Sequence, residues 1–176
     1  MRNKLLMLSA LLFSLILFGQ KEGWKTYEKD GYSVQYPKNW EYSDQKPQPM
    51  VQFVLLSEED SQQGDNFREN INLSTEFLQG RDIGLDAYVE IALDQVEKQI
   101  PSAKILSTED MSLNGIKAKS SIWTADFGSG VMLKFKQYIL ISDGTAYILT
   151  FTSTVAEFDE YVNQATDILD TFKINS

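Results

Sequence analysis

Alternation of apolar and polar side chains predicts β-strands over much of the chain. Residues 32–36 alternate in this way, and so do residues 71–77 and 131–138. Residues 145–151 differ, because both sets of alternate positions are largely apolar. That pattern predicts a strand buried on both faces, so we place it at the centre of a sheet.

Short turn signals separate the apolar segments. Asp30-Gly31, Asn114-Gly115 and Asp143-Gly144 each lie between two such segments. Asp-Gly and Asn-Gly favour type I′ turns, because both central residues of that turn need a positive φ. These dipeptides therefore predict β-hairpins and a largely antiparallel sheet.

Helical spacing replaces the alternation in two segments. From Leu85 to Ile100 the apolar residues recur every three or four positions, and Pro101 then prevents the helix from continuing. A second helix is predicted from Val155 to about Thr171. Thr154 and Glu157 stand before it in the T-x-x-E spacing of a capping box.

Two polar stretches, residues 42–50 and 57–70, are typical of loops. The predicted order is a hairpin, further strands, a helix, a long β-meander and a closing helix. Separated runs of strands with two helices indicate an α+β fold, in which helices flank an antiparallel sheet. We see no second-domain boundary, so the sequence predicts one domain.

The N-terminus has the pattern of a secretory signal peptide. Arg2 and Lys4 precede an uncharged apolar run from Leu5 to Phe18, which is too short to span a bilayer comfortably. We expect cleavage after Gly19 or Gln20, which divides the chain into a signal peptide (1–20) and an α+β domain (21–176). The alternative is an uncleaved N-terminal anchor.

The chain contains no cysteine. It therefore has no disulfides and no site for the acyl chain of a lipoprotein. Its stability must come from a packed core, and a composition with 43% hydrophobic residues supports such a core and argues against disorder.

The segment Gly31–Trp40 (GYSVQYPKNW) resembles the opening strand of the PsbP-like superfamily. That superfamily also includes DcrB-like bacterial envelope proteins and Mog-type Ran-binding proteins. The order of the later elements fits the same family, and the closing helix ends near an aromatic residue, Phe172. The resemblance implies an antiparallel sheet between helices and a non-enzymatic role at a protein surface.

Tyr36, Pro37 and Trp40 carry the most specific part of this resemblance, and they also have a structural interpretation. Pro37 has no N–H, so it ends a strand or lies at a sheet edge. Trp40 can then fold back over one end of the core. The alternative is an aromatic contact site for a ligand.

The formal net charge of −9 disfavours binding to nucleic acid and to anionic lipid surfaces. The acidity provides solubility or, alternatively, attraction to a cationic partner. Neither histidine nor cysteine is present, which excludes Ser-His-Asp triads, thiol catalysis and most zinc sites. Gly128-Ser129-Gly130 is interpreted as a turn, because it lacks the strand–turn–helix context of a nucleophile elbow. We predict no catalytic residue and no cofactor.

Most carboxylates are assigned to solvent-facing sides of the helices. The first helix has such a side at Asp86, Glu90, Asp94 and Glu97, and the second has one at Asp159, Asp167 and Asp170. The one candidate metal site is an acidic loop that offers several oxygen ligands to a hard cation, although it lacks the EF-hand spacing. Its residues are Glu58, Glu59, Asp60 and Asp65; the alternative is a solvated loop.

Three functional hypotheses follow. The first is an exported accessory or protein-interaction domain of the bacterial cell envelope. It would be periplasmic or secreted, with an unidentified protein partner, no nucleic acid and no stable membrane span after cleavage. The second is a binding module for a small apolar or lipidic ligand, suggested by 3 Trp, 8 Tyr and 10 Phe. The third is a carboxylate-based hydrolase.

Overall fold

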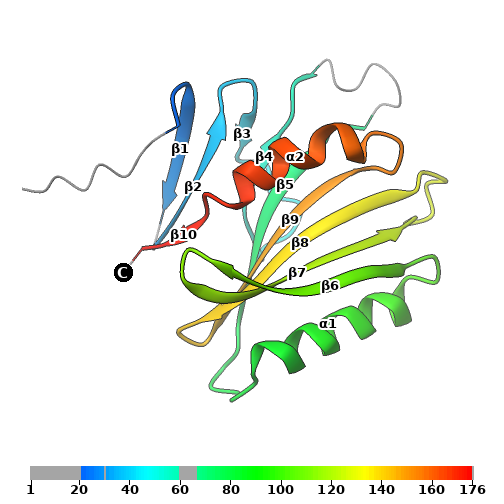
Figure 1. The fold of residues 1–176 in the computed structure, drawn as a ribbon. Coiled ribbons are helices and arrows are strands. Elements are labelled where there is room, and N and C mark those ends of the chain that lie inside the picture. The colour runs from blue at the N-terminus through cyan, green and yellow to red at the C-terminus, as the bar shows by residue number, and fades with distance from the viewer. Residues whose placement is uncertain (1–20, 30, 60–66, 176) are drawn as a thin grey trace, which may run out of the picture.

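All strand pairings in the part of the chain that the structure describes are antiparallel. The structure is a computed structural model, and it describes residues 21–29, 31–59 and 67–175. The elements, shown in Figure 1, are β1 (Trp24–Lys29), β2 (Tyr32–Pro37), β3 (Glu41–Ser43), β4 (Val51–Leu56), β5 (Asn70–Phe77), α1 (Leu85–Gln99), β6 (Lys104–Leu113), β7 (Ile116–Ala125), β8 (Leu133–Ser142), β9 (Thr145–Thr154), α2 (Phe158–Leu169) and β10 (Lys173–Ile174).

The strands form two sheets. A three-stranded sheet has the order β1-β2-β10, and a seven-stranded sheet has the order β3-β4-β5-β9-β8-β7-β6. Helix α1 carries the chain from β5 to the far edge at β6, and the meander β6 to β9 then returns to pair with β5. This path puts β9 in the middle of the sheet, as its two apolar faces predict. The α+β fold with an antiparallel sheet is confirmed.

The predicted hairpin turns are also present. Asn114 and Gly115 have φ values of 49° and 88°, and Asp143 and Gly144 have 48° and 71°, as type I′ turns require. The first turn links β1 to β2, and its Gly31 has φ 90°. Asp30 lies outside the described residues, as does the predicted signal peptide, residues 1–20.

The helices cover opposite faces of the seven-stranded sheet (Figure 1). Val89 and Leu93 of α1 pack on Trp123, Phe135 and Ile139 of β7 and β8. On the other face, α2 and β2 enclose the larger core, which contains residues of both sheets. No helix in the described ranges has both the length and the apolar character needed to cross a membrane.

Helix α1 matches its prediction, because it begins at Leu85 and ends at Gln99, two residues before Pro101. Helix α2 begins at Phe158, three residues later than predicted. The reason is that Thr154 is still part of β9, where it pairs with Leu133. Its hydroxyl donates to the Glu157 carboxylate at 3.2 Å, and no side chain caps the helix, so the predicted capping box is wrong.

Candidate functional site

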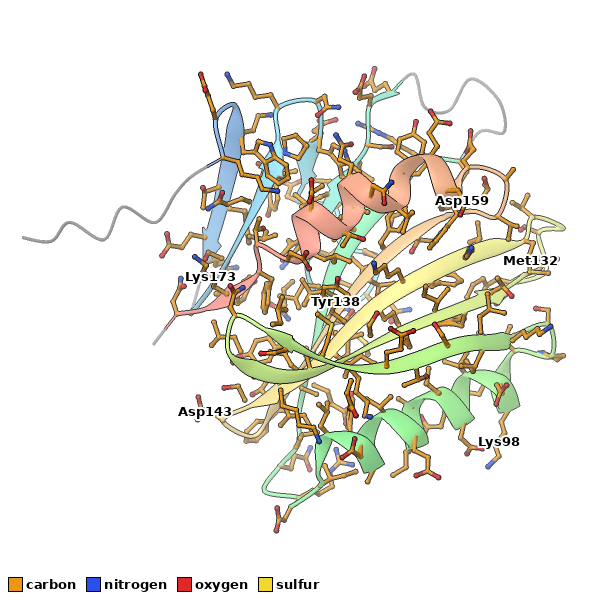
Figure 2. All side chains as sticks on the ribbon, in the orientation of Figure 1. Lys98, Met132, Tyr138, Asp143, Asp159 and Lys173 are labelled. Atoms are coloured by element: carbon orange, nitrogen blue, oxygen red, sulfur yellow. The ribbon has the colours of Figure 1, made fainter. Side chains whose placement is uncertain are left out.

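Four exposed apolar side chains lie on neighbouring loops at one end of the seven-stranded sheet. Phe127 is 59% exposed, Val131 38%, Met132 42% and Val155 46%. The first three belong to the loop between β7 and β8, and the fourth follows β9. We call this group the apolar rim; Figure 2 labels Met132 at this end of the molecule.

The loop that carries three rim residues is held by one carboxylate. Asp126 accepts hydrogen bonds from the backbone N–H groups of Gly128, Ser129 and Gly130, at distances of 2.9 to 3.1 Å. Ser102, just beyond α1, donates from its hydroxyl to the Asp126 carbonyl at 2.8 Å. The Gly-Ser-Gly segment is therefore a fixed turn rather than a catalytic elbow, and it presents the apolar side chains beside it.

Met132 and Val155 are neighbours because they continue the ladder between β8 and β9. Leu133 pairs with Thr154 at the end of that ladder, and the Val155 N–H donates to the Met132 carbonyl at 3.0 Å. Phe127 is anchored separately, with its ring edge-on to Phe135 at 5.9 Å between centroids. The backbone thus holds the rim side chains in solvent, whereas the apolar side chains beneath α1 and α2 are buried.

Acidic residues border the rim. Asp159 and Glu160 lie in the first turn of α2 and are exposed. Lys134 reaches to 3.8 Å from the Asp159 carboxylate, and its ammonium group also lies 4.0 Å from the centroid of the Phe158 ring. This arrangement gives an apolar centre with a mainly negative border, which suits protein binding and provides no nucleophile with a base.

The predicted cation loop is only partly described. Glu58 and Glu59 are exposed, and Asn39 donates a hydrogen bond to the Glu58 carboxylate. Asp60 and Asp65 lie outside the described residues. Within the described ranges, no group of three or more acidic side chains is positioned to hold a metal ion.

Tyr36, Pro37 and Trp40 lie away from the rim. Tyr36 and Trp40 belong to the larger core, and Trp40 is only 1% exposed. Pro37 is the last residue of β2, where it pairs with Trp24. The indole N–H of Trp40 donates to the side-chain oxygen of Gln164 on α2 at 2.7 Å.

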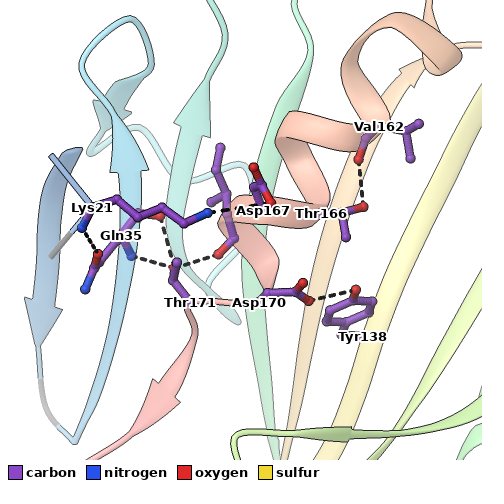
Figure 3. Close-up of polar contacts among 9 residues, drawn as sticks. Lys21, Gln35, Tyr138, Val162, Thr166, Asp167, Asp170 and Thr171 are labelled. Carbon is purple, nitrogen blue, oxygen red and sulfur yellow. Dashed lines mark hydrogen bonds and ion pairs between the residues drawn. The ribbon is translucent and has the colours of Figure 1, made fainter. Parts of the chain in front are cut away.

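Two carboxylates of the second predicted helix, which the sequence places on its solvent-facing side, contact other side chains in the structure. Tyr138 donates to the Asp170 carboxylate at 3.0 Å, and Lys21 lies 3.6 Å from Asp167 (Figure 3). Burial, and then the nearby charge of Asp170, raise the pKa of Tyr138. These contacts fasten α2 to the sheets and carry no arrangement of acid and base for catalysis.

Sequence reasoning did not identify the rim. Its only sequence signal was an apolar pair, Val131-Met132, directly after a glycine-rich turn. The sequence analysis placed both residues in a strand, but β8 begins at Leu133, so they remain in the loop.

The chain resembles known proteins in family and in fold. A family model described as PsbP-like protein matches residues 18–174. No curated protein matches the chain. Among solved structures, cyanobacterial PsbP (CyanoP) from Synechocystis sp. PCC 6803 shares 16% identity with a TM-score of 0.63, and the match covers 93% of this chain and 98% of that chain.

Two further structures share the fold. LpqN from Mycobacterium tuberculosis, described as involved in cell envelope biogenesis, has 15% identity and a TM-score of 0.60, with 87% of this chain and 92% of that chain covered. The Ran-binding protein Mog1p of Saccharomyces cerevisiae has 8% identity and a TM-score of 0.59, with 86% and 95% covered. At these identities the likeness concerns the fold alone.

Proposed function

The chain belongs to the PsbP-like protein family, and on that basis we propose that it is an exported, non-enzymatic accessory protein of the cell envelope that binds another protein through its apolar rim. The observation that carries this proposal is the exposure of Phe127, Val131, Met132 and Val155 on adjoining loops. Clustered apolar side chains in solvent are characteristic of interaction sites, whereas single ones are ordinary.

Charge defines the kind of partner. The whole chain has a formal charge of −9, and Asp159 and Glu160 are exposed beside the rim. A partner surface with an apolar centre and a border of lysine or arginine would complement it. Two proteins of the same fold support the proposal: Mog1p is described as Ran-binding, and LpqN as involved in cell envelope biogenesis.

Export is the second part of the proposal. Its support is the sequence from Arg2 to Phe18, with basic residues before an apolar run. The test is the intact mass of the protein recovered from outside the cytoplasm. A mass equal to that of a chain starting near residue 20 supports a cleaved signal peptide. A mass that includes residues 1–19 rejects cleavage.

The rim is tested by site-specific photocrosslinking in cells that produce the full chain. A photoactivatable residue replaces Met132 in one version and Phe77 in the control version. Phe77 is 67% exposed and pairs with Thr145, at the opposite end of the sheet from the rim. We expect one protein to crosslink at position 132 and not at position 77.

The captured protein is then purified and its affinity measured by calorimetry. Replacing both Met132 and Val155 by serine should weaken binding about tenfold or more, whereas Phe77→Ser should not change it. Unchanged thermal unfolding of each variant serves as the folding control. Equal affinities of the two variants for the partner would refute the rim as the binding surface.

A further inference from the structure

A separate cavity of about 350 Å³ lies at the other end of the β6–β7 hairpin, away from the rim. It lies between the hairpin turn, β8 and the C-terminal segment that carries β10. Figure 1 shows that turn beside β10. The lining residues are Leu113, Asn114, Ile116, Leu140, Phe172, Lys173 and Ile174.

The cavity exists because α2 ends before it reaches this part of the sheet. Leu113 pairs with Ile116 across the hairpin, and Leu140 lies two strands away in the same layer. Helix α2 ends at Leu169, and only Phe172 and the two residues of β10 continue over these side chains. Apolar sheet surface is therefore left with a thin and incomplete cover.

Lys173 is the one charged residue among the described residues that line the cavity. Lys173 pairs with Ser33, so its side chain shares the outer face of the small sheet, where both residues line a different hollow. Ile174 pairs with Tyr32 and faces inward. Asn114 donates from its amide to the carbonyls of Asp170 and Phe172, at 3.2 and 2.7 Å, which leaves its oxygen as an acceptor.

We propose that this cavity binds a small uncharged amphiphile, with an alkyl chain against the apolar walls and a hydroxyl group at Asn114. The volume of the cavity and the mainly apolar character of its lining residues support this proposal. An apolar cavity of about 150 Å³ is enough for benzene, so one of 350 Å³ accepts a medium-length chain. A charged head group would lose its hydration without gaining an ion pair there. The inference does not depend on the rim or on export.

The test uses the full chain, with 1-octanol as the probe and octanoate as its charged counterpart. Binding is followed by nuclear magnetic resonance of backbone amides and side-chain methyl groups. With octanol we expect saturable shifts at Leu113, Ile116, Leu140 and Ile174. The affinity for octanoate should be lower than that for octanol by about tenfold or more.

Two variants make the test specific. Ile116→Trp fills the cavity from its partly exposed side and should reduce octanol affinity about tenfold or more. Ile91→Trp, at a position 49% exposed on α1, adds the same bulk on the opposite side of the sheet and should leave affinity unchanged. Thermal unfolding establishes that both variants fold.

The proposal is overturned if octanol gives no saturable shifts, or if the shifts are spread equally over α1 and the rim. Equal affinity for octanoate would also overturn it, because the site would then recognise charge.

Discussion

Trp40 connects the end of β2 to α2 through a single side chain. Its backbone N–H donates to the Pro37 carbonyl at 3.1 Å, so the chain turns back as soon as the strand ends. The indole ring then lies in the larger core, and its N–H reaches Gln164. The proline and the tryptophan thus act together: one ends the strand and the other fills the space below the turn.

Trp40→Ala should lower the free energy of unfolding by about 3–5 kcal/mol, because it leaves a large cavity in a site with 1% exposure. Gln164→Ala removes only the hydrogen bond and should cost about 1 kcal/mol. Trp40→Phe, which keeps an aromatic ring, should fall between them. Urea unfolding measures all three, and a Trp40→Ala protein as stable as the parent would contradict this account.

For single residues, the sequence predicts a structural role, such as covering the core, better than it predicts the contacting partner. The Y-P-x-x-W spacing led us to expect Trp40 over the core, but nothing in the sequence relates it to Gln164. Glu69 is a sharper example. We placed it in a polar loop, yet it is fully buried and accepts hydrogen bonds from the hydroxyls of Ser57 and Ser153, the second of which lies on β9.

Helix α2 is held at its C-terminal end by contacts with distant segments of the chain. Thr171, just beyond its end, accepts a hydrogen bond from the Gln35 N–H at 2.8 Å, and its hydroxyl lies 2.6 Å from the Ile168 carbonyl (Figure 3). Lys21 adds an ion pair with Asp167. These contacts join the C-terminal end of the helix to β2 in the small sheet.

Thr171→Val should lower the free energy of unfolding by about 1–3 kcal/mol, because the Gln35 N–H loses its acceptor while the side-chain shape is retained. Thr171→Ser keeps the hydroxyl and should cost clearly less. Urea unfolding compares the two variants, and hydrogen exchange at Gln35 reports the bond directly. A smaller cost for valine than for serine would contradict this prediction, because it would show that the methyl group, and not the hydroxyl, matters.

The longer elements were predictable because each carries several periods of its own pattern. The hairpins flanking Asn114-Gly115 and Asp143-Gly144 and helix α1 are examples. The start of α2 was not predictable, because Thr154 could either cap the helix or extend β9. In the structure it pairs with Leu133 in β9 and does not cap the helix. Strands β3 and β10, with three and two residues, are too short to show any period and exist only through their pairing partners.

At the scale of the whole molecule, titration behaviour follows from composition and burial. The chain has no histidine, so no side chain with an ordinary pKa near 6.5 changes charge around neutrality. Several tyrosines have raised pKa values, and burial is the largest cause for each. They are Tyr27, Tyr36, Tyr88, Tyr138 and Tyr161.

The free energy of unfolding should therefore change little near neutral pH and decrease at alkaline pH. A raised pKa means that the folded state holds the phenol proton more tightly than the unfolded state. The resulting stabilisation is complete below the unfolded pKa of about 10 and is lost as pH rises through the folded values. Urea unfolding at about pH 7, 9 and 10.5 measures this loss.

Tyr138→Phe supplies the control for this prediction. It removes one buried phenol, so the loss of stability with pH above about 10 should become less steep, by up to about 1.4 kcal/mol per pH unit. An unchanged slope would show that Tyr138 does not contribute. Stability that rises above pH 10 in the parent protein would show that the five tyrosines do not dominate the change, because the pKa of Lys136 is lowered by burial and acts in the opposite direction.

The small sheet joins the two ends of the described chain: Ser33 and Tyr32 pair with Lys173 and Ile174, and the Asn175 N–H donates to the Gly31 carbonyl at 2.7 Å. Synthesis delivers the β1–β2 hairpin long before its third strand. While β10 is still inside the ribosome, one side of β2 therefore lacks its strand partner, and these long-range contacts form only after β10 has emerged.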